Sequence, residues 1–424
     1  MWRSAHNRTW KGAGYQLTLA LIFAFAVSPA VEAGPLQSVP DTVCYGQVPV
    51  SRSRARSLTL VNRGTEALFV DSVLAVGSFD LPTDPLISTA LFLPAADSLT
   101  VAVHFSPAVA GSDSGGLRIQ MTDLLGIPLP ELLVPLFGTG TDIVIDEVLA
   151  DPGSGLSGDA NGDGTRQTFA DEFVELLNRG PEAVDLEGWR LGDDDAAAVS
   201  WFEFPPLTWL PAGSRAVLFG GGTPQGFADP ATIFTDDGRI GDGLSNSGDG
   251  LFLIDADGDT ASTVASDLSW NSNQSVTRYP SGDGPFVAHS APPGDGRLHS
   301  PQAARSVVDS IRLIPADTTI VEGQQFDLQW TIYWSDGRID QPPPPLDSFA
   351  FTTSSSVDVA QVDGAGRVAG GAPGEAAITG SFMTVVSQPL LLHVVPESPG
   401  ARCVVISEVL AAPPRRARWR RQWG

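Results

Sequence analysis

Short runs of alternating apolar and polar residues, separated by glycine-rich turns, constrain the fold of this chain more than any other feature. The run Leu99-Thr-Val-Ala-Val-His-Phe105 keeps a period of two over its whole length. Successive side chains of a strand point to opposite faces of a sheet, so each such run buries one face. The 45 glycines and 34 prolines supply turns between the runs. The pattern predicts an all-β fold of tandem sandwiches, with strands at 56–62, 67–73, 99–105, 116–120, 143–145, 173–177, 251–254 and 326–334.

Length and charge set the number of modules and exclude one class of partner. At roughly 150 residues per domain, the 424 residues correspond to about three domains. Hydrophobic residues make up 42% of the chain, which is enough for each module to bury a core. The net charge of −24 opposes nucleic-acid binding, because affinity for phosphates depends on Lys and Arg. We therefore expect no nucleic-acid partner.

The N-terminal residues 1–33 have the three-part plan of a secretory signal peptide. Three cationic residues precede the apolar run 17–27, and Val31-Glu-Ala33 has the spacing of a cleavage site. The apolar run is shorter than the ~20 residues that a membrane span needs. We expect a secreted or cell-surface protein without a transmembrane span in the mature chain. An uncleaved anchor helix is the alternative.

Cys44 and Cys403 are the two cysteines of the chain, and they lie near opposite ends of the mature sequence. An exported protein can pair such residues, but two cysteines do not form a disulfide framework. We expect both to be unpaired, with a long-range disulfide as the alternative.

Several short segments characterise residues 36–140: Tyr45-Gly-Gln-Val-Pro-Val50, Thr59-Leu-Val-Asn-Arg-Gly-Thr65, His104-Phe-Ser-Pro107, Ala110-Gly111 and Val134-Pro-Leu-Phe-Gly-Thr-Gly140. Together they resemble an immunoglobulin-like domain of the ASH/Hydin type. The resemblance covers almost the whole segment and implies a β-sandwich of the kind found in bacterial surface proteins.

Residues 141–300 resemble the lamin-tail domain, which is an immunoglobulin-like sandwich also common in exported bacterial proteins. Trp189 and Leu191 are expected in its core, with Gly188 supplying a bulge or turn beside them. The matching pieces are Ile145-Asp-Glu-Val148, Glu172-Phe-Val-Glu-Leu-Leu-Asn178, Ala183-Val-Asp-Leu-Glu-Gly-Trp-Arg-Leu191, Phe202-Glu-Phe-Pro205, Leu210-Pro-Ala-Gly213, Leu244-Ser-Asn-Ser-Gly-Asp-Gly-Leu-Phe-Leu253 and Ser275-Val-Thr-Arg278.

Residues 301–397 resemble the bacterial immunoglobulin-like group 2 domain, on Gly323-Gln324, 357–363, Gly366-Arg-Val368 and 374–379. Members of that family occur in adhesins and as spacers in extracellular enzymes. The aromatic residues Phe326, Trp330, Tyr333 and Trp334 are expected in the core. Stacking on sugars is the alternative role for them.

The last residues, 398–424, are expected to begin a second lamin-tail repeat. Val404-Val-Ile-Ser-Glu-Val-Leu-Ala-Ala-Pro413 nearly repeats Ile143-Val-Ile-Asp-Glu-Val-Leu-Ala-Asp-Pro152. An arginine-rich sequence, 415–424, then replaces the acidic loop that follows the first copy. We expect a truncated or frameshifted repeat, because a lone strand cannot be stable without its sheet. A natural basic tail for an acidic surface is the alternative.

The sequence predicts no catalytic site. The five histidines do not cluster, neither cysteine has a histidine near it, and no nucleophile elbow or phosphate-binding glycine loop is present. Carboxylates are numerous enough that a glycosidase pair is not excluded by composition. Modules that match sandwich families end to end nevertheless leave no segment for a catalytic domain, so we expect no enzyme.

The candidate ligand site is a calcium loop at Asp159-Ala-Asn-Gly-Asp-Gly164. Oxygen-bearing side chains at alternate positions, followed by glycine, resemble a calcium-binding loop. Position twelve is Ala170 instead of the glutamate of an EF-hand, so Asp171 or Glu172 would have to complete the site. The predicted ligands are Asp159, Asn161, Asp163, Asp171 and Glu172, and the alternative is a hydrogen-bonded turn without an ion.

Two further acidic positions receive structural roles. Asp255-Ala-Asp-Gly-Asp259 is a weaker calcium candidate and is expected to be a hairpin turn. Glu175 is expected to form a structural salt bridge or hydrogen bond.

These features predict a non-catalytic secreted or cell-surface protein that acts in adhesion, binding or spacing. Its partner would be an extracellular or cell-surface protein or a glycan, bound by loops or strand edges. The alternative is a set of accessory modules from a secreted hydrolase whose catalytic domain is not in this chain.

Overall fold

The computed structural model describes residues 34–82, 90–193, 201–266, 272–340, 349–353 and 357–397. The regular elements of these residues are strands, apart from two short 3₁₀ helices, η2 (Gly155–Gly158) and η3 (Pro230–Thr232). The predicted all-β class is therefore confirmed. No helix in the described part of the chain has the length and apolar character to cross a membrane. The predicted signal peptide, the proline run at 342–345, Cys403 and the C-terminal repeat lie outside the described residues.

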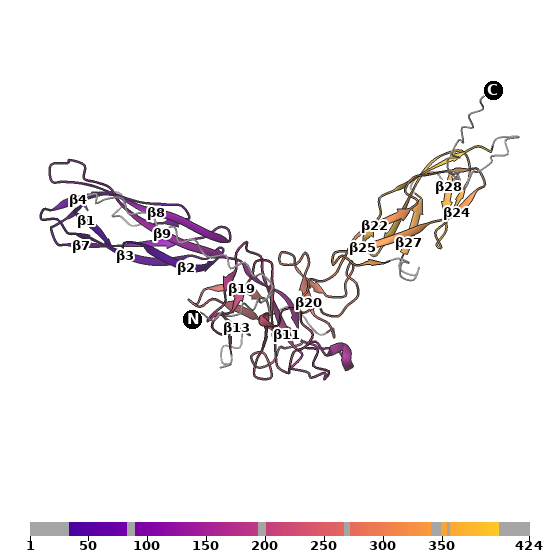
Figure 1. The fold of residues 1–424 in the computed structure, drawn as a ribbon, viewed down its shortest axis with the longest axis horizontal. Coiled ribbons are helices and arrows are strands. Elements are labelled where there is room, and N and C mark those ends of the chain that lie inside the picture. Colours follow the sequence, from indigo (N-terminus) through magenta and orange to yellow (C-terminus); the bar gives the residue numbers. More distant parts are fainter. Residues whose placement is uncertain are drawn as a thin grey trace, which may run out of the picture. The chain divides into compact units, whose positions relative to one another are not determined.

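The chain divides into two compact units between Gly140 and Thr141. The first unit contains the first module (residues 34–140), which is a sandwich of two antiparallel sheets (Figure 1). One sheet has the order β1 (Leu36–Val39), β3 (Arg54–Asn62), β7 (Ser98–Phe105) and β5 (Phe79–Asp80). The other has the order β2 (Val43–Pro49), β9 (Leu132–Thr141), β8 (Gly111–Thr122), β4 (Leu68–Val76) and β6 (Leu91–Leu93).

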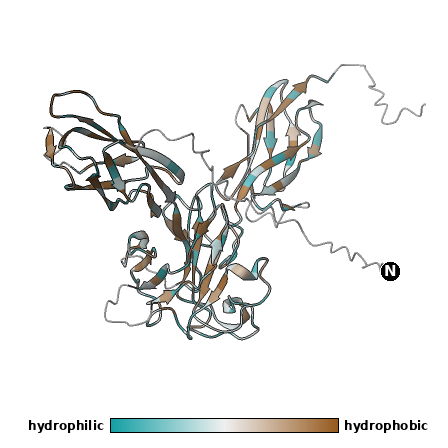
Figure 2. Cartoon of the chain, turned by 60° about the vertical axis from the view of Figure 1, so that its left-hand side comes forward, coloured by the Kyte–Doolittle hydropathy of each residue, from teal (hydrophilic) through white to brown (hydrophobic). Residues whose placement is uncertain are grey.

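Alternation builds the core of the first module. Strand β9 buries Val134 and Leu136 and exposes Leu133, as a period of two requires. Hydrophobic and hydrophilic residues are interspersed along the strands of the described residues (Figure 2). Tyr45 packs its ring against Phe79 and Phe105, and its hydroxyl donates to the carbonyl of a β7 residue. Burying an aromatic ring while pairing its polar end is the favourable arrangement for tyrosine. Cys44, on β2, is exposed.

The second module comprises residues 141–306. Its larger sheet has the order β17 (Ile233–Thr235), β16 (Arg215–Phe219), β11 (Phe173–Asn178), β10 (Ile143–Leu149), β20 (Val276–Arg278) and β21 (Phe286–Ala288). The opposing sheet has the order β14 (Phe202–Glu203), β13 (Arg190–Asp193), β18 (Leu251–Ile254) and β19 (Thr260–Val264). A two-stranded pair joins β12 (Val184–Asp185) to β15 (Trp209–Leu210).

The predicted core residues of the second module are buried, since Trp189 is 1% and Leu191 0% exposed. Gly188 precedes them at φ +73°, in a turn closed by the bond from the Trp189 amide to the carbonyl of Leu186. A left-handed residue at this position favours glycine. Residues 255–259 form the turn of the hairpin between β18 and β19, as predicted.

The third module comprises residues 307–397. One of its sheets has the order β22 (Val308–Ile314), β25 (Gln329–Trp334) and β26 (Ile339–Asp340). A second has the order β23 (Thr318–Val321), β32 (Leu390–Val395), β30 (Gly374–Phe382) and β27 (Phe349–Thr353). A third has the order β24 (Gln325–Asp327), β29 (Arg367–Gly370) and β28 (Ala360–Val362). Strand β31 (Val385–Val386) pairs with β30.

The prediction of a single strand at 326–334 is wrong, because the structure has two strands there. The strand is interrupted at Leu328, whose amide donates to the carbonyl of Gly366, and β24 and β25 belong to different sheets. The aromatic residues mainly serve the core, as expected. Trp330 is 8% and Trp334 6% exposed, and the ring of Trp330 stacks on Phe349 at 4.7 Å.

The first two modules contain the same hydrogen-bonding arrangement, formed in each by the asparagine of an Asn-Arg-Gly sequence. Asn178 is fully buried at the end of β11, and its side-chain nitrogen donates to the carbonyls of Glu182, Leu210 and Pro211. Its side-chain oxygen accepts the amide of Gly180 at 2.9 Å. The buried side-chain amide of Asn178 thus joins the end of β11 to the turn that follows it and to the end of β15.

Asn62 makes the same set of bonds at the end of β3. Its nitrogen donates to Glu66, Leu93 and Pro94, and its oxygen accepts the amide of Gly64 at 3.0 Å. Two modules that resemble different families therefore fix the same strand connection in the same way.

We predict that Asn178→Ala lowers the free energy of unfolding of the second module by about 2–4 kcal/mol, because buried carbonyls and an amide lose their partner. Native-state hydrogen exchange of the full chain measures this locally. Asn246→Ala is the control, since Asn246 is exposed and its side chain bonds Asp151 on the surface. Equal effects of the two substitutions would contradict the role given to Asn178.

Candidate functional site

The predicted calcium loop follows η2 and is closed by its own side chains. Oδ2 of Asp159 accepts the amide of Gly164 at 2.8 Å, and Oδ1 of Asp163 accepts that of Thr165 at 2.9 Å. Oδ2 of Asp163 also accepts the amide of Thr223 at 3.3 Å, which ties the loop to the residues after β16. Aspartates cap turns in this way with or without an ion.

Asn161 and Asp171 are buried beneath the loop and engage protein partners. The nitrogen of Asn161 donates to the carbonyls of Ala170 and Gly221. The two oxygens of Asp171 accept the amides of Asn161 at 3.2 Å and Gln167 at 2.6 Å. Burial raises the pKa of Asp171, and these two hydrogen bonds oppose the rise. Both residues therefore hold the loop in shape.

The structure does not bring Glu172 to the loop. Its Oε2 accepts the amide of Leu244 at 3.1 Å, in the loop that precedes β18. Asp171 and Glu172 are consecutive residues at the entry to β11, so their side chains diverge. Burial raises the pKa of Glu172 to about 8, although the hydrogen bond from Leu244 opposes the rise.

The loop fits a cation in part. Oδ1 of Asp159 is buried and has no hydrogen-bond partner, which is the state of an oxygen that lacks a ligand. Among the described residues, however, no three His, Cys, Asp or Glu side chains converge closely enough to hold a metal ion. Asp159 and Asp163, with backbone carbonyls or water, would have to form such a site.

Carboxylates gather at the end of the sandwich that carries this loop. Residues 141–306 contain 27 of the 49 acidic and 8 of the 25 basic residues of the chain. Strands β10, β11 and β16 reach the same end, because Phe173 pairs with both Leu149 and Phe219. The loop before β18 bonds to Asp151, Glu172 and Asp193 there. We call this the acidic end; it comprises Asp151, Asp159, Asp163, Asp171, Glu172, Asp193, Asp236, Asp237, Asp242 and Asp249.

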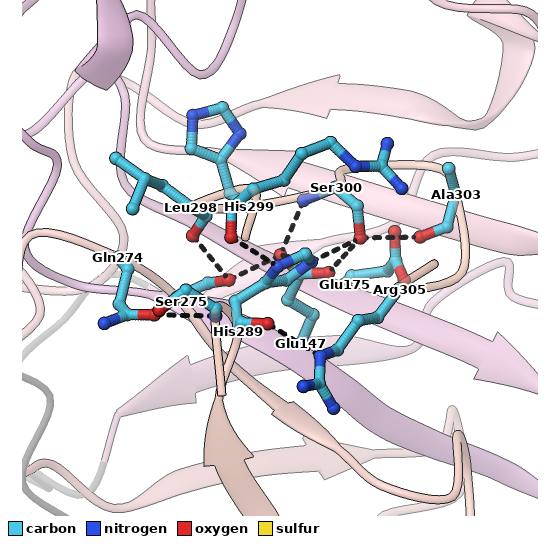
Figure 3. Close-up of polar contacts among 12 residues, drawn as sticks. Glu147, Glu175, Gln274, Ser275, His289, Leu298, His299, Ser300, Ala303 and Arg305 are labelled. Atoms are coloured by element: carbon cyan, nitrogen blue, oxygen red, sulfur yellow. Dashed lines mark hydrogen bonds and ion pairs between the residues drawn. The ribbon is translucent and has the colours of Figure 1, made fainter. Parts of the chain in front are cut away.

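A second polar group, which the sequence analysis did not identify, lies inside the second module around Glu147 (Figure 3). Glu147 is on β10 and is 1% exposed. Its Oε1 accepts Oγ of Ser275 at 2.6 Å and the amide of Ser300 at 2.9 Å, and its Oε2 lies 2.9 Å from Oγ of Ser300. Burial raises the pKa of Glu147, and the bonds from Ser275 and Ser300 oppose the rise.

Asp146 and Glu175 share the guanidinium of Arg215. Nε of Arg215 donates to Oε1 of Glu175 at 2.8 Å, and Nη2 donates to Oδ2 of Asp146 at 3.1 Å. Oε2 of Glu175 accepts the amide of Gln302 at 2.6 Å. Burial raises the pKa of Glu175 well above its usual value and the neighbouring Glu147 adds to the rise, whereas Arg215 opposes it. The salt bridge predicted for Glu175 is present.

His289 completes the group. Its Nδ1 lies 3.0 Å from the carbonyl oxygen of Arg297, and its Nε2 lies 2.8 Å from Oγ of Ser300. Nε of Arg305 donates to the carbonyl of His289 at 2.6 Å. Burial lowers the pKa of His289 to about 4. The ring is therefore neutral at physiological pH.

This buried group fastens residues 298–305, which we call the terminal segment, to the larger sheet. The amides of Ser300 and Gln302 donate to carboxylates of β10 and β11, and the amide of Ser275 donates to Leu298. Ser300 is 4% and His289 0% exposed, so no substrate can reach the serine–histidine contact. The arrangement serves to hold the module together.

Comparison with known families assigns two of the modules. Residues 138–267 match the family described as Lamin Tail Domain, and residues 307–386 match Bacterial Ig-like domain (group 2). Both resemblances predicted from the sequence are thereby confirmed. The family match to the second module ends at residue 267, before the terminal segment. No curated protein matches the chain.

The comparison with solved structures finds matches to parts of the chain. The ASH/PapD-like domain 7 of human CEP192 is 12% identical, with 28% of this chain and 94% of that chain covered at a TM-score of 0.22. A protein of unknown function from Porphyromonas gingivalis W83 is 14% identical, with 43% and 81% covered at 0.24. The VesB protease of Vibrio cholerae is 15% identical, with 25% and 32% covered at 0.20.

We predict that Arg215→Ala lowers the free energy of unfolding of the second module by about 3–5 kcal/mol, because it leaves two buried carboxylates without a cation. Arg179→Ala is the matched control. Arg179 also pairs with two carboxylates, Asp142 and Asp283, but it is 30% and Asp283 75% exposed in the side chain, so the expected loss is about 1 kcal/mol or less. Hydrogen exchange on β10 and β11 measures both. A loss for Arg215→Ala no larger than that of the control would refute the assignment.

Proposed function

We propose, for a chain that contains a lamin tail domain followed by a group 2 bacterial Ig-like domain, a non-catalytic role outside the cell, in which the modules space and present a binding surface. The acidic end of the second module is the observation that carries this proposal. Loops at the end of a sandwich are free to vary and commonly form its binding site. Those of its carboxylates that reach the surface, among them Asp163, Asp237 and Asp242, favour cations and cationic ligands.

The chemistry of the polar groups supports binding over catalysis. The carboxylates of the calcium loop accept backbone amides, which fixes their positions in the turns. The histidine and serine that do contact one another are sealed inside the module. A general acid or base must reach the proton that it transfers, and these groups cannot.

We further propose that the loop at 159–164 binds calcium. The buried, unpartnered Oδ1 of Asp159 supports this proposal, together with the second carboxylate on Asp163. Calcium accepts carboxylate and carbonyl oxygens in flexible geometry, and extracellular sites work at millimolar concentration. The ion would supply positive charge at the acidic end and link two loops that meet there.

Titration of the full chain with Ca²⁺ in a calorimeter tests this proposal. We expect binding with a Kd of about 10⁻⁴–10⁻³ M and loss of the heat signal in Asp159→Asn. Glu172→Gln should retain binding, because Glu172 faces away from the loop. Asp257→Asn, in the Asp-Gly turn between β18 and β19, is the matched control and should also retain it. No heat from the wild-type chain would refute calcium binding, and equal loss in all three variants would refute the site.

Binding of an extracellular partner is tested separately, on glycan and cell-binding arrays with and without calcium. We expect the chain to bind to some array positions through the acidic end. Binding there should therefore decrease in a variant in which Asp236, Asp237 and Asp242 are changed to Asn. Retention unaffected by these changes would place the binding surface elsewhere.

A further inference from the structure

The hydroxyl of Ser300 has one hydrogen and three hydrogen-bonding neighbours inside the second module (Figure 3). Its Oγ lies 2.9 Å from Oε2 of Glu147, 2.8 Å from Nε2 of His289 and 2.9 Å from the carbonyl oxygen of Ala303. A hydroxyl donates once and accepts through its lone pairs. The hydroxyl hydrogen can therefore reach one of these three atoms, and a proton on Glu147 or His289 has to supply any second hydrogen bond to Oγ, because the carbonyl of Ala303 can only accept.

The tautomer of His289 follows from its other nitrogen. Nδ1 lies 3.0 Å from the carbonyl oxygen of Arg297, which can only accept. Nδ1 therefore carries a hydrogen, and in a neutral ring Nε2 is the acceptor. Nε2 then needs a donor, and the hydroxyl of Ser300 is the group in contact with it.

The two carboxyl oxygens of Glu147 also differ in their hydrogen-bond partners. Oε1 accepts two donors, the hydroxyl of Ser275 and the amide of Ser300. Oε2 lies against the hydroxyl oxygen of Ser300, which can donate its single hydrogen to Oε2 or to His289 but not to both. When the hydrogen goes to His289, the contact at Oε2 is a hydrogen bond only if Oε2 itself carries a proton.

We propose that Glu147, Ser300 and His289 form a relay that retains one proton in the folded module, held on Oε2 of Glu147 beside a neutral imidazole, and that this proton latches the terminal segment to the sheet. Oε2–H donates to Ser300, and Ser300 donates to Nε2 of His289. The proposal rests on these contacts and is independent of the binding role of the acidic end.

Other proton counts are less favourable. With one proton, the contacts at Oε2 and Nε2 both have a hydrogen and the one with the carbonyl of Ala303 has none. Without the proton, one of the contacts at Oε2 and Nε2 also has two acceptors and no hydrogen, which leaves a buried polar atom unpaired. With a second proton, the hydroxyl turns to Ala303 and every contact has a hydrogen, but the relay becomes cationic in the interior next to Arg305. The same single proton on His289 would create an ion pair in the interior, at a large desolvation cost.

The charges around His289 act mainly against protonation of its ring. Arg305 and Arg297 disfavour an imidazolium there, whereas Asp295 favours it, and burial lowers the pKa of His289 to about 4. Burial raises the pKa of Glu147, and the charge of Glu147 raises the pKa of Glu175. The charged or titratable groups that interact with Glu147 or His289 include Glu175 on β11 and Asp295, Arg297, His299 and Arg305 after β21. Asp146 on β10 and Arg215 on β16 act on Glu175.

The relay makes attachment of the terminal segment depend on pH. The pKa of Glu147 is raised in the folded module, so the stabilisation is complete at low pH and is lost as pH rises through that pKa. Release of one proton on opening gives at most a tenfold change in the opening equilibrium per pH unit. The amide of Ser300, which donates to Glu147, reports this opening directly.

Glu147→Gln is the decisive variant, because a glutamine reproduces the protonated carboxyl. Its carbonyl oxygen can accept Ser275 and the Ser300 amide, and its nitrogen can donate to the Ser300 hydroxyl. In the full wild-type chain, we expect hydrogen-exchange protection of the Ser300 amide, corrected for intrinsic rate, to fall with rising pH. In Glu147→Gln, protection should match the wild-type value at low pH and stay constant as pH rises.

Loss of protection in Glu147→Gln at every pH would overturn the proposal, since it would mean that the carboxylate anion is required. The nitrogen NMR shifts of His289 in the wild-type chain provide a test that needs no variant. The proposal predicts a neutral ring with hydrogen on Nδ1 at pH 7. A ring protonated on both nitrogens, or on Nε2 alone, would also overturn it.

Discussion

The second module depends on carboxylates buried at the centre of its larger sheet. Asp146 and Glu147 on β10 and Glu175 on β11 together bind Arg215, serine hydroxyls and backbone amides from strands and loops far apart in the chain. A buried carboxylate without such partners costs several kcal/mol, so none of these attachments can be removed cheaply. The polar interior thereby specifies which segments meet, which apolar packing alone does less sharply.

This arrangement explains why the module extends past the part that matches its family. The match ends at residue 267, yet Ser275, His289, Ser300 and Gln302 supply partners to the central carboxylates. The terminal segment has no regular structure of its own, and its place is set by these bonds. At the acidic end, Asp159 and Asp163 likewise accept backbone amides and so hold the loops there.

The sequence predicted what depends on local pattern. Alternation and turn residues identified the sandwiches, and the motif around Trp189 identified the second module. Contacts between residues far apart in the chain could not be predicted from the sequence. Glu147 and Ser300, for example, are 153 positions apart, and nothing in the sequence pairs them. The predictions that Glu172 joins the calcium loop and that 326–334 is one strand failed for a related reason. The amide of Leu244 sets the direction of Glu172, and the carbonyl of Gly366 pairs with Leu328 where the strand is interrupted. The repeated Asn-Arg-Gly sequence was visible, but its hydrogen bonds reach strands that only the fold brings near.

Native-state hydrogen exchange across the wild-type second module tests the central claim most directly. The claim is that buried carboxylates make the terminal segment an integral part of the sandwich. It predicts that at low pH, where Glu147 holds its proton, the amides of Ser300 and Gln302 exchange with the same free energy of opening as those of β10 and β11. Exchange of these two amides at a lower free energy, while the strands stay protected, would contradict it.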